Sequence, residues 1–261
     1  MPGNTLIIGH RGSSHDAPEN TLASFRFAFA QGADGIEADF RLTRDGKIIC
    51  LHDAGTRRTA GIDIKVADAS LQELRRLDVG AWKGERWQGE LIPMLEEVLE
   101  AIPPGRKLLI ELKSGPEIVA PLRKILEQKV RDTTSIKILS FNEKVVSESR
   151  RLLPQYKSIY LQDIRRSAIP GEWHPEFEHT LRILHETGAD GLASRAKKCV
   201  DSSYVQALHS SGRELHVWTV DSPATAKRFL DLGVDSIMTN RPGWLREKLK
   251  LQKIHGVNIT C

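Results

Sequence analysis

Charged side chains stand at the ends of several short apolar runs in this sequence, and their types and spacing could do chemistry. The runs are TLIIG, GI, KIIC and LLI, and the charged pairs at or near their ends are His10 with Arg11, Glu37 with Asp39, His52 with Asp53, and Glu111 with Lys113. Runs of this length are typical of buried strands. Glu37 and Asp39 are two residues apart, so a strand would point both carboxylates to one face, where burial without a partner is too costly to keep. A bound cation is the obvious compensation.

Short apolar runs alternate with longer amphipathic segments along the chain, which favours a parallel sheet with helical crossovers. The candidate strands are residues 5–9, 35–39, 47–51, 107–113, 136–140, 158–161, 191–193, 214–220 and 236–239. The candidate helices are residues 21–31, 95–101, 117–129, 143–152, 175–187, 202–210 and 223–232. Asn20 is predicted to cap the first of them. Glycines follow four of these helices, as is common at helix ends, namely Gly32, Gly188, Gly212 and Gly233.

Nine strand candidates are one more than an eight-stranded barrel needs. The link between Asp39 and Lys47 is too short for a crossover helix, and residues 44–46 look like a tight turn, so this stretch is either a hairpin or an irregular strand. Because charged residues end many separate strands instead of gathering at one point of an open sheet, we predict a TIM-type (β/α)8 barrel. We expect residues 1–261 to form a single barrel domain.

A long polar segment, residues 54–93, breaks the alternation. It contains RRTAG, the short helical segment LQELRRL, and Trp82 and Trp87. Its length exceeds that of an ordinary connection between a strand and a helix. We predict a small insertion after the third strand that caps the C-terminal mouth of the barrel, where such folds keep their chemistry. A decoration that only stabilises the barrel is the alternative.

The composition narrows the class of protein. A chain of 261 residues with 40% hydrophobic content can bury a full core. Its 38 basic and 34 acidic residues leave a net charge of +4, which is spread along the chain rather than collected into a stripe. The charge alone therefore does not indicate nucleic acid, an anionic small-molecule substrate fits as well, and we expect no nucleic-acid partner. No oligomeric state is indicated.

Cysteine usage and hydropathy indicate the compartment. Cys50, Cys199 and Cys261 include no C-x-x-C pair, which favours a reducing and therefore cytoplasmic environment. The N-terminal residues show no secretion signal, and no apolar run approaches the roughly 18 residues of a spanning helix. We therefore expect no stable membrane insertion.

Several sequence motifs occur in the order of a known family. They are His10-Arg11-Gly12, Pro18-Glu19-Asn20-Thr21, Glu37-Ala38-Asp39, Thr43-Arg44-Asp45-Gly46 with His52-Asp53, Pro93-Met94-Leu95-Glu96-Glu97, Glu111-Leu112-Lys113, Ser140-Phe141, Val217-Trp218-Thr219-Val220 and Thr239-Asn240-Arg241-Pro242. Over essentially its whole length the chain resembles the glycerophosphodiester phosphodiesterase family. Many motifs in order carry far more weight than His-Arg-Gly alone.

The resemblance implies a metal-dependent phosphodiesterase that releases glycerol 3-phosphate and an alcohol from compounds such as glycerophosphocholine or glycerophosphoethanolamine. It makes Glu37, Asp39 and Glu111 the metal ligands. Three carboxylates without cysteine or clustered histidine suit a hard cation, Ca²⁺ or Mg²⁺, rather than zinc or copper. The alternative is a buried ion network in which these acids pair with neighbouring bases, namely Arg11, Arg41 or Lys113.

Phosphodiester hydrolysis needs a base for the nucleophile and an acid for the leaving alkoxide, and imidazole titrates in the right range for both. The resemblance gives these roles to His10 and His52, and it places Arg11 and Lys113 on the phosphate. The nucleophile is either the 2-hydroxyl of glycerol, which gives a cyclic phosphate that water opens, or water itself. His216 is expected to be a packed core histidine. The remaining histidines are expected at the surface, namely His15, His174, His179, His185, His209 and His255.

Four further residues are assigned weaker roles. Phe141 and Trp218 stand at or near strand ends and form either an apolar wall against the substrate or part of the core. Glu19 and Asn20 either orient the site or cap the first helix, and capping is the default for an asparagine there.

Other functions fit parts of the same pattern. A lysophospholipase D-type enzyme would use the same polar centre on lysolipids, but no amphipathic membrane-binding helix is evident. A metal-dependent aldolase could place similar residues at strand ends, although its chemistry does not call for two histidines. A non-catalytic barrel that only binds a ligand is the alternative from another class.

Overall fold

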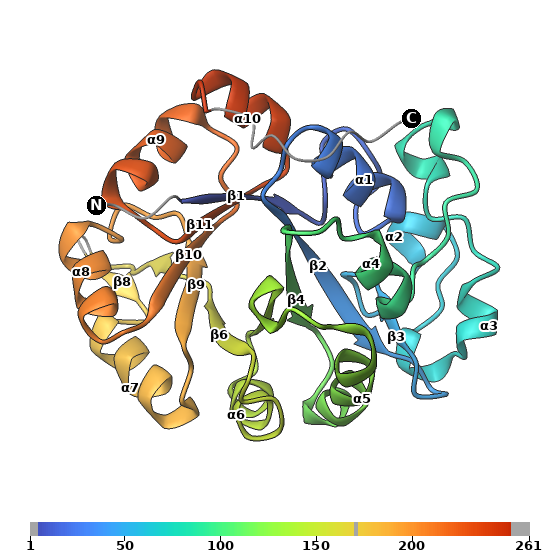
Figure 1. Cartoon of the computed structure of the whole chain (residues 1–261), viewed down its shortest axis with the longest axis horizontal. Helices are drawn as coiled ribbons and strands as arrows, with labels where there is room; N and C mark the ends of the chain where they lie inside the picture. The colour runs from blue at the N-terminus through green and yellow to red at the C-terminus, as the bar shows by residue number, and fades with distance from the viewer. Residues whose placement is uncertain (1–4, 170–171, 252–261) are drawn as a thin grey trace.

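The computed structural model describes residues 5–169 and 172–251. Figure 1 shows a ring of strands at the centre with helices around it. In the described residues the ring consists of parallel strands in the order β1 (Leu6–His10), β2 (Gly35–Leu42), β4 (Lys107–Leu112), β5 (Ile136–Ser140), β6 (Lys157–Gln162), β9 (Gly191–Arg195), β10 (Glu214–Trp218) and β11 (Ser236–Thr239). β1 pairs with both β2 and β11, so the sheet closes on itself. The predicted TIM-type barrel is confirmed.

The additional strand candidate is an antiparallel strand attached to the barrel. β3 (Ile48–Cys50) pairs with the end of β2, where Phe40 lies opposite Cys50. The turn between them passes through Gly46 at a φ of 73°, a conformation that glycine adopts without strain. The stretch between Asp39 and Lys47 is therefore a hairpin, and its second strand runs back along β2 from Leu42 to Phe40.

Helices cover the outside of the barrel (Figure 1). They are α1 (Leu22–Ala30), α4 (Leu95–Ala101), α5 (Val119–Lys129), α6 (Glu143–Leu152), α7 (Phe177–Thr187), α8 (Ser202–Ser210), α9 (Pro223–Leu232) and α10 (Pro242–Lys248). Short 3-10 turns precede α5 and β5, at η4 (Pro116–Ile118) and η5 (Thr133–Ser135). The four glycines expected after helices all have positive φ, as a helix-ending glycine requires, namely Gly32, Gly188, Gly212 and Gly233.

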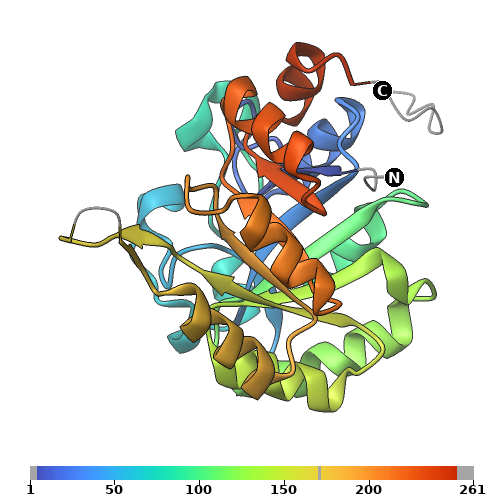
Figure 2. The same cartoon turned by 90° about the vertical axis from the view of Figure 1, so that its left-hand side faces the viewer.

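One helix and one hairpin outside the insertion are absent from the sequence prediction. One is α10, the last described helix. The other is a small hairpin after β6, formed by β7 (Arg165–Arg166) and β8 (Trp173–His174). Figure 2 shows this hairpin, in yellow-gold, reaching out beyond the neighbouring helices. Both elements are too short to give a clear periodic pattern.

The start of α1 differs from the sequence prediction. Thr21, not Asn20, is the N-terminal cap, because the Thr21 hydroxyl accepts a hydrogen bond from the backbone N–H of Ser24 at 3.2 Å. Asn20 has a φ of 59° and turns its side chain toward Asp39 instead. The prediction that Asn20 caps the helix was wrong, because this backbone conformation carries its amide away from the first turn.

Side chains alternate between two cores along each barrel strand. In β4, Ile110 packs outward against the helices, whereas Leu109 packs inside the barrel. Glu111, two residues after Leu109, therefore points into the barrel. Glu37 and Asp39 alternate with the outward-packed residues of β2 in the same way.

The insertion predicted at residues 54–93 has a small core of its own. Its regular elements are α2 (Arg57–Ala60), η1 (Val66–Asp68), α3 (Leu71–Leu74), η2 (Ala81–Lys83) and η3 (Glu85–Trp87). Apolar side chains of the insertion pack on those of the β3 segment, namely Ile49, Leu51, Val66, Ala69, Leu74, Leu77, Val79 and Ile92.

The position of the insertion is beside the barrel rather than across its centre. It lies outside β3, next to α1 and α4 (Figure 1). It contacts the loop after β1, where Lys83 Nζ donates to the backbone oxygen of Ser14 at 2.8 Å. Its role as a cap of the mouth stays a prediction, as does the organisation of the chain as a single domain. Within residues 5–169 and 172–251, no helix combines the length and apolar character that crossing a bilayer requires.

At the N-terminal end of the barrel, one carboxylate is held by three bases. Glu214 lies 2.5 Å from Lys137 Nζ, 2.6 Å from Lys157 Nζ and 3.2 Å from His216 Nε2. His216 is buried, and its Nδ1 lies 2.8 Å from Ser236 Oγ, so it is the packed and hydrogen-bonded histidine that the sequence predicts. Burial alone would raise the pKa of Glu214, but His216 and Lys137 outweigh it and hold that pKa well below its ordinary value.

This ion cluster predicts a pH-dependent contribution to stability. Glu214→Gln should lower the free energy of unfolding at pH 7 by about 2 kcal/mol, because it leaves Lys137 and His216 without their carboxylate. A carboxyl whose folded-state pKa is depressed stabilises the fold above its unfolded-state pKa and loses that contribution as the pH falls. The difference between wild type and variant, measured by urea unfolding, should therefore shrink below the ordinary pKa of 4.5.

The matched control is Asp231→Asn, which removes an exposed pair with Lys227 and should change stability by less than about 0.5 kcal/mol. An effect of Glu214→Gln that stays constant between neutral and strongly acidic pH would contradict the account.

Candidate functional site

Strands β1, β2 and β4 bring most of the predicted polar site residues together at one end of the barrel. His10 lies opposite Glu37 in the β1–β2 pairing, and Asp39 lies opposite Glu111 in the β2–β4 pairing. Lys113 directly follows β4 and continues its inward face. The carboxyl ends of parallel barrel strands share one rim, so residues from distant parts of the chain meet there.

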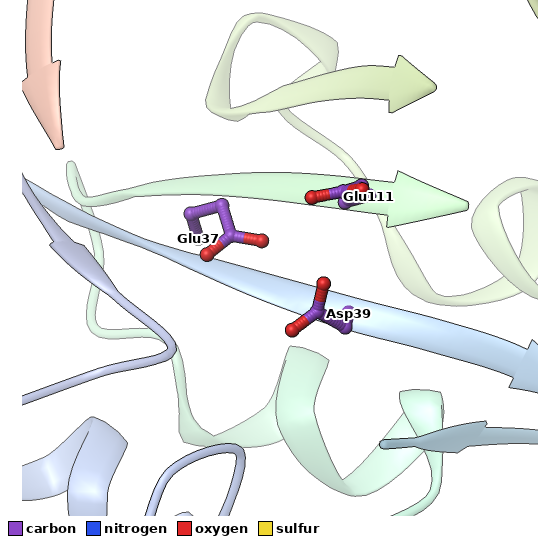
Figure 3. Close-up of side chains that lie close together, drawn as sticks. All are labelled: Glu37, Asp39 and Glu111. Atoms are coloured by element: carbon purple, nitrogen blue, oxygen red, sulfur yellow. The ribbon is translucent and has the colours of Figure 1, made fainter. Parts of the chain in front are cut away.

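The centre of the site is a cluster of three carboxylates. Glu37, Asp39 and Glu111 each offer a carboxylate oxygen, and these oxygens all lie within 4.8 Å of one another. Figure 3 shows the three side chains converging from β2 and β4. All three residues are buried, with exposed fractions of 1%, 1% and 7%. Glu37 Oε1 accepts no hydrogen bond from any residue that the structure describes.

The three carboxyl groups differ in their affinity for protons. Burial and the neighbouring charges of Asp39 and Glu111 raise the pKa of Glu37 well above its ordinary value. Burial and Asp39 raise the pKa of Glu111 to about 7. Burial would also raise the pKa of Asp39, but Lys113 and Arg11 lower it far below the usual range. Asp39 therefore holds the most persistent negative charge in the cluster.

Two cations contact the cluster in the described part of the chain. Arg11 Nε lies 3.1 Å from Asp39 Oδ2, and the backbone N–H of Arg11 donates to Glu37 Oε2 at 3.0 Å. Lys113 Nζ lies 3.1 Å from Asp39 Oδ1 and also pairs with Glu111. Of the buried ion network that the sequence offered as an alternative, the pairs with Arg11 and Lys113 are therefore present.

The third base considered from the sequence points elsewhere. Arg41 donates from Nη2 to the backbone oxygen of His52 at 2.6 Å, so its guanidinium supports the chain after β3 rather than the carboxylates. Three carboxylates against the two cations in contact leave one negative charge when all are ionised. A buried, oxygen-only set with an excess negative charge and an orphaned oxygen could hold a divalent cation.

Asn20 fixes the position of Asp39 from two sides. Its Nδ2 donates to Asp39 Oδ2 at 2.8 Å, and its Oδ1 accepts the backbone N–H of Asp39 at 3.2 Å. The same Oδ1 accepts the thiol of Cys50 at 3.2 Å. Glu19 accepts a hydrogen bond from Arg11 Nη1 at 2.9 Å. The sequence left open whether Glu19 and Asn20 orient the site or cap the first helix. In the structure both residues make contacts within the site.

His10 is held by a neutral partner. Its Nδ1 lies 2.8 Å from Asn240 Oδ1, and Asn240 is itself anchored by donating from Nδ2 to Asp221 Oδ2 at 2.7 Å. Burial, with a smaller contribution from Arg11, lowers the pKa of His10 to about 4. His10 Nε2 lies 3.9 Å from Glu37 Oε2, which puts this nitrogen beside the carboxylate cluster.

His52 is held by a charged partner. Its Nδ1 lies 2.7 Å from Asp53 Oδ1. Burial is the largest cause that lowers the pKa of His52, and Asp39 and Asp53 oppose it. In both histidines Nδ1 is bound to an acceptor oxygen, so the second nitrogen, Nε2, carries the lone pair of the neutral ring.

The other histidines lie away from this cluster or outside the described residues. Residues with exposed side chains, as expected, are His15, His174, His179, His185 and His209. His255 and Cys261 lie outside the described residues, and Cys50 and Cys199 are free thiols.

Two aromatic side chains lie next to the cations of the site. Phe141 and Trp218 pack edge to face, with ring centroids 5.7 Å apart, and Phe141 is 43% exposed. Lys113 Nζ lies 5.6 Å from the centroid of Phe141, and Arg195 lies 5.3 Å from that of Trp218. Phe141 therefore lies at the surface of the mouth, whereas Trp218 also packs against the core inside the barrel.

Sequence reasoning missed the residues that hold the histidines. Asn240 and Asp53 belong to motifs that the sequence singles out, but no role follows from their types alone. Nothing in the sequence around Asp221 indicates a role in the site, because its contact with Asn240 depends on the pairing of β10 with β11. Arg58 is part of the basic run RRTAG, which resembles an ordinary solvated surface; the structure shows it bound to Glu19 and Asp53.

Comparisons with known proteins agree on one family. The model of the glycerophosphoryl diester phosphodiesterase family matches residues 10–244. A glycerophosphodiester phosphodiesterase of Caldanaerobacter subterraneus subsp. tengcongensis is 33% identical over 242 residues, which cover 91% of this chain and 95% of the relative. A glycerophosphodiester phosphodiesterase of Bacillus subtilis is 31% identical over 257 residues and is covered to 85%, with 92% of this chain.

A solved structure gives the same result. The phosphodiesterase of Oleispira antarctica, determined in complex with its product sn-glycerol-3-phosphate, superposes with a TM-score of 0.83 at 28% identity, covering 94% of this chain and 96% of that one. The chain therefore belongs to the glycerophosphoryl diester phosphodiesterase family.

Proposed function

We propose that this protein hydrolyses glycerophosphodiesters such as glycerophosphocholine and glycerophosphoethanolamine to glycerol 3-phosphate and an alcohol, and that it needs a divalent cation to do so. Glycerophosphodiester phosphodiesterase activity is supported by the family and by the relatives. The observation that carries the finer proposal is the buried carboxylate cluster, which contacts two cations and keeps one excess negative charge when all three acids are ionised.

Glu37, Asp39 and Glu111 are the proposed ligands of the cation, which we take to be Ca²⁺ or Mg²⁺ because the donors are all oxygens. When bound, such an ion offsets the carboxylate charge and polarises a phosphoryl oxygen. Arg11 and Lys113 already lie against the cluster, and we propose that they neutralise the remaining charge of the phosphate.

His10 and His52 are the proposed proton carriers. One ring removes a proton from the nucleophile, and the other gives a proton to the leaving alkoxide. Asn240 and Asp53 fix the Nδ1 side of the two rings, which supports Nε2 as the working nitrogen of each. This arrangement of the two rings is compatible with attack by the 2-hydroxyl of glycerol and with attack by water.

The remaining assignments concern the surroundings of the substrate. We propose Phe141 and Trp218 as an apolar wall beside the phosphate-binding Lys113. The product bound by the Oleispira antarctica phosphodiesterase supports a small-molecule substrate with a glycerol phosphate unit. We keep the expectation of a cytoplasmic location, which rests on the cysteine pattern, and of no nucleic-acid partner.

Cation binding predicts a change in thermal stability. After EDTA treatment, adding Ca²⁺ or Mg²⁺ to about a hundred times its dissociation constant should raise the melting temperature by about 5 °C, because a ligand of the folded state stabilises it. Glu37→Gln should lose most of this increase, since it removes a ligand charge without changing side-chain size. Differential scanning fluorimetry measures both.

Glu178→Gln, which removes an exposed carboxylate of α7, is the matched control and should keep the increase. An increase of equal size in Glu37→Gln, or none in the wild type, would contradict the proposed cation site.

Removing either proton carrier should slow turnover strongly. His10→Ala and His52→Ala should each lower kcat on glycerophosphocholine by about 10²- to 10⁴-fold, because general acid–base catalysis typically supplies that much. Release of glycerol 3-phosphate, followed in a coupled assay with Ca²⁺, with Mg²⁺ and with EDTA, measures the effect. His185→Ala, at an exposed position of α7, should retain activity.

Three outcomes would overturn parts of this proposal. Full activity in both histidine variants would refute the assigned proton carriers, and release in EDTA would refute the need for a cation. Hydrolysis of a lysophospholipid without turnover of any glycerophosphodiester would favour a lysophospholipase D-type function.

A further inference from the structure

Arg58, in helix α2 of the insertion, binds two carboxylates at once. Its Nε donates to Asp53 Oδ2 at 2.7 Å, while Nη1 and Nη2 donate to the two oxygens of Glu19 at 2.8 and 2.7 Å. The guanidinium thus uses one edge on Asp53 and forms a bidentate pair with Glu19. Such forked contacts fix the geometry of both partners in a way that a single ammonium cannot.

Each of the two carboxylates also holds a residue of the proposed machinery. Glu19 Oε1 accepts from Arg11 Nη1 at 2.9 Å, and Asp53 Oδ1 binds His52 Nδ1 at 2.7 Å. A continuous chain of charge-assisted hydrogen bonds therefore runs from His52 to Arg11, and Arg58 is the link at its middle. Arg11 extends the chain to the carboxylate cluster through Asp39.

The division of oxygens within each carboxylate shows what Arg58 contributes. Asp53 gives Oδ1 to His52 and Oδ2 to Arg58, so the guanidinium fixes the rotation of the carboxylate that the imidazole uses. Glu19 differs, because its Oε1 accepts from both Arg11 and Arg58 while its Oε2 accepts from Arg58. Without Arg58, each carboxylate would retain only its partner in the site, and two acids would face each other without the cation between them.

The exposure of these residues separates this role from one in stability. The Arg58 side chain is 43% exposed and that of Asp53 33%, whereas Glu19 is 12% exposed. The exposed pair between Arg58 and Asp53 contributes little to folding, and the less exposed Glu19 keeps Arg11 as a cationic partner when Arg58 is replaced. The effect of these pairs on the orientation of His52 and Arg11 can nevertheless be large, because small misplacements of reacting groups slow catalysis steeply.

We propose that Arg58 is a positioning residue through which the insertion sets the orientation of both His52 and Arg11. The inference deepens the proposed function and rests on it for the roles of these two residues. It also gives the insertion a task in the reaction that does not require it to cover the mouth.

Arg57 offers a matched control in the same short helix. Its Nε lies 3.4 Å from Asp63 Oδ2, and its side chain is 78% exposed. Arg58→Gln should lower kcat on glycerophosphocholine by about 10- to 100-fold with little change in melting temperature. Arg57→Gln should change neither quantity. Arg58→Lys should restore only part of the rate, because one ammonium cannot span both carboxylates in this geometry.

A double-mutant cycle tests whether Arg58 acts through Asp53. Arg58→Gln should cost much less in an Asp53→Asn background than in the wild type, since the link to His52 is already broken. Equal fold-losses in the two backgrounds would overturn the claim that Arg58 positions His52 through Asp53, and an unchanged kcat in Arg58→Gln would overturn the positioning role as a whole.

A measurement without substrate keeps this test separate from the proposed function. The imidazole ¹H–¹⁵N signals of His52, identified by their absence in His52→Ala, should shift in Arg58→Gln and stay unchanged in Arg57→Gln. Unchanged His52 signals in Arg58→Gln would overturn the inference. A wild-type protein that turns over no glycerophosphodiester would instead refute the proposed function. The spectra would then still show whether Arg58 sets the environment of His52.

Discussion

Burial of three carboxylates at one end of the barrel is the constraint on which the site depends. Glu37, Asp39 and Glu111 point inward because the strands that carry them alternate between two apolar cores. The same alternation that builds the core therefore forces negative charge into the mouth. Arg11 and Lys113 offset part of that charge, and one orphaned oxygen of Glu37 marks where compensation is incomplete.

A second layer of polar residues fixes the members of the site in place. Asn20 holds Asp39, and Asn240 and Asp53 hold the two histidines. These contacts come from widely separated segments, and the pair between His10 and Asn240 spans 230 residues. Closure of the barrel between β1 and β11 is what brings these two together, so the fold and the site form as one unit. The insertion joins the same layer through Arg58.

The sequence predicts what depends on local pattern and misses what depends on tertiary contacts. Apolar runs predict the barrel strands, and the spacing of Glu37 and Asp39 predicts that their carboxylates share a face. Asn20 shows the limit, because an asparagine before a helix has the local signal of a cap, whereas its positive φ and its bonds to Asp39 follow from packing. Arg58 shows the same limit, since a basic run in a polar segment carries no sign of the two carboxylates that it binds.

Anomalous diffraction from crystals grown with Mn²⁺, a substitute for Mg²⁺ or Ca²⁺ at oxygen sites, tests the central claim most directly. The account predicts an anomalous peak among the carboxylates of Glu37, Asp39 and Glu111, and loss of that peak in Glu37→Gln. Carboxylates still paired only with Arg11 and Lys113 at saturating Mn²⁺, with no peak between them, would show that the cluster is a closed ion network and would contradict the account.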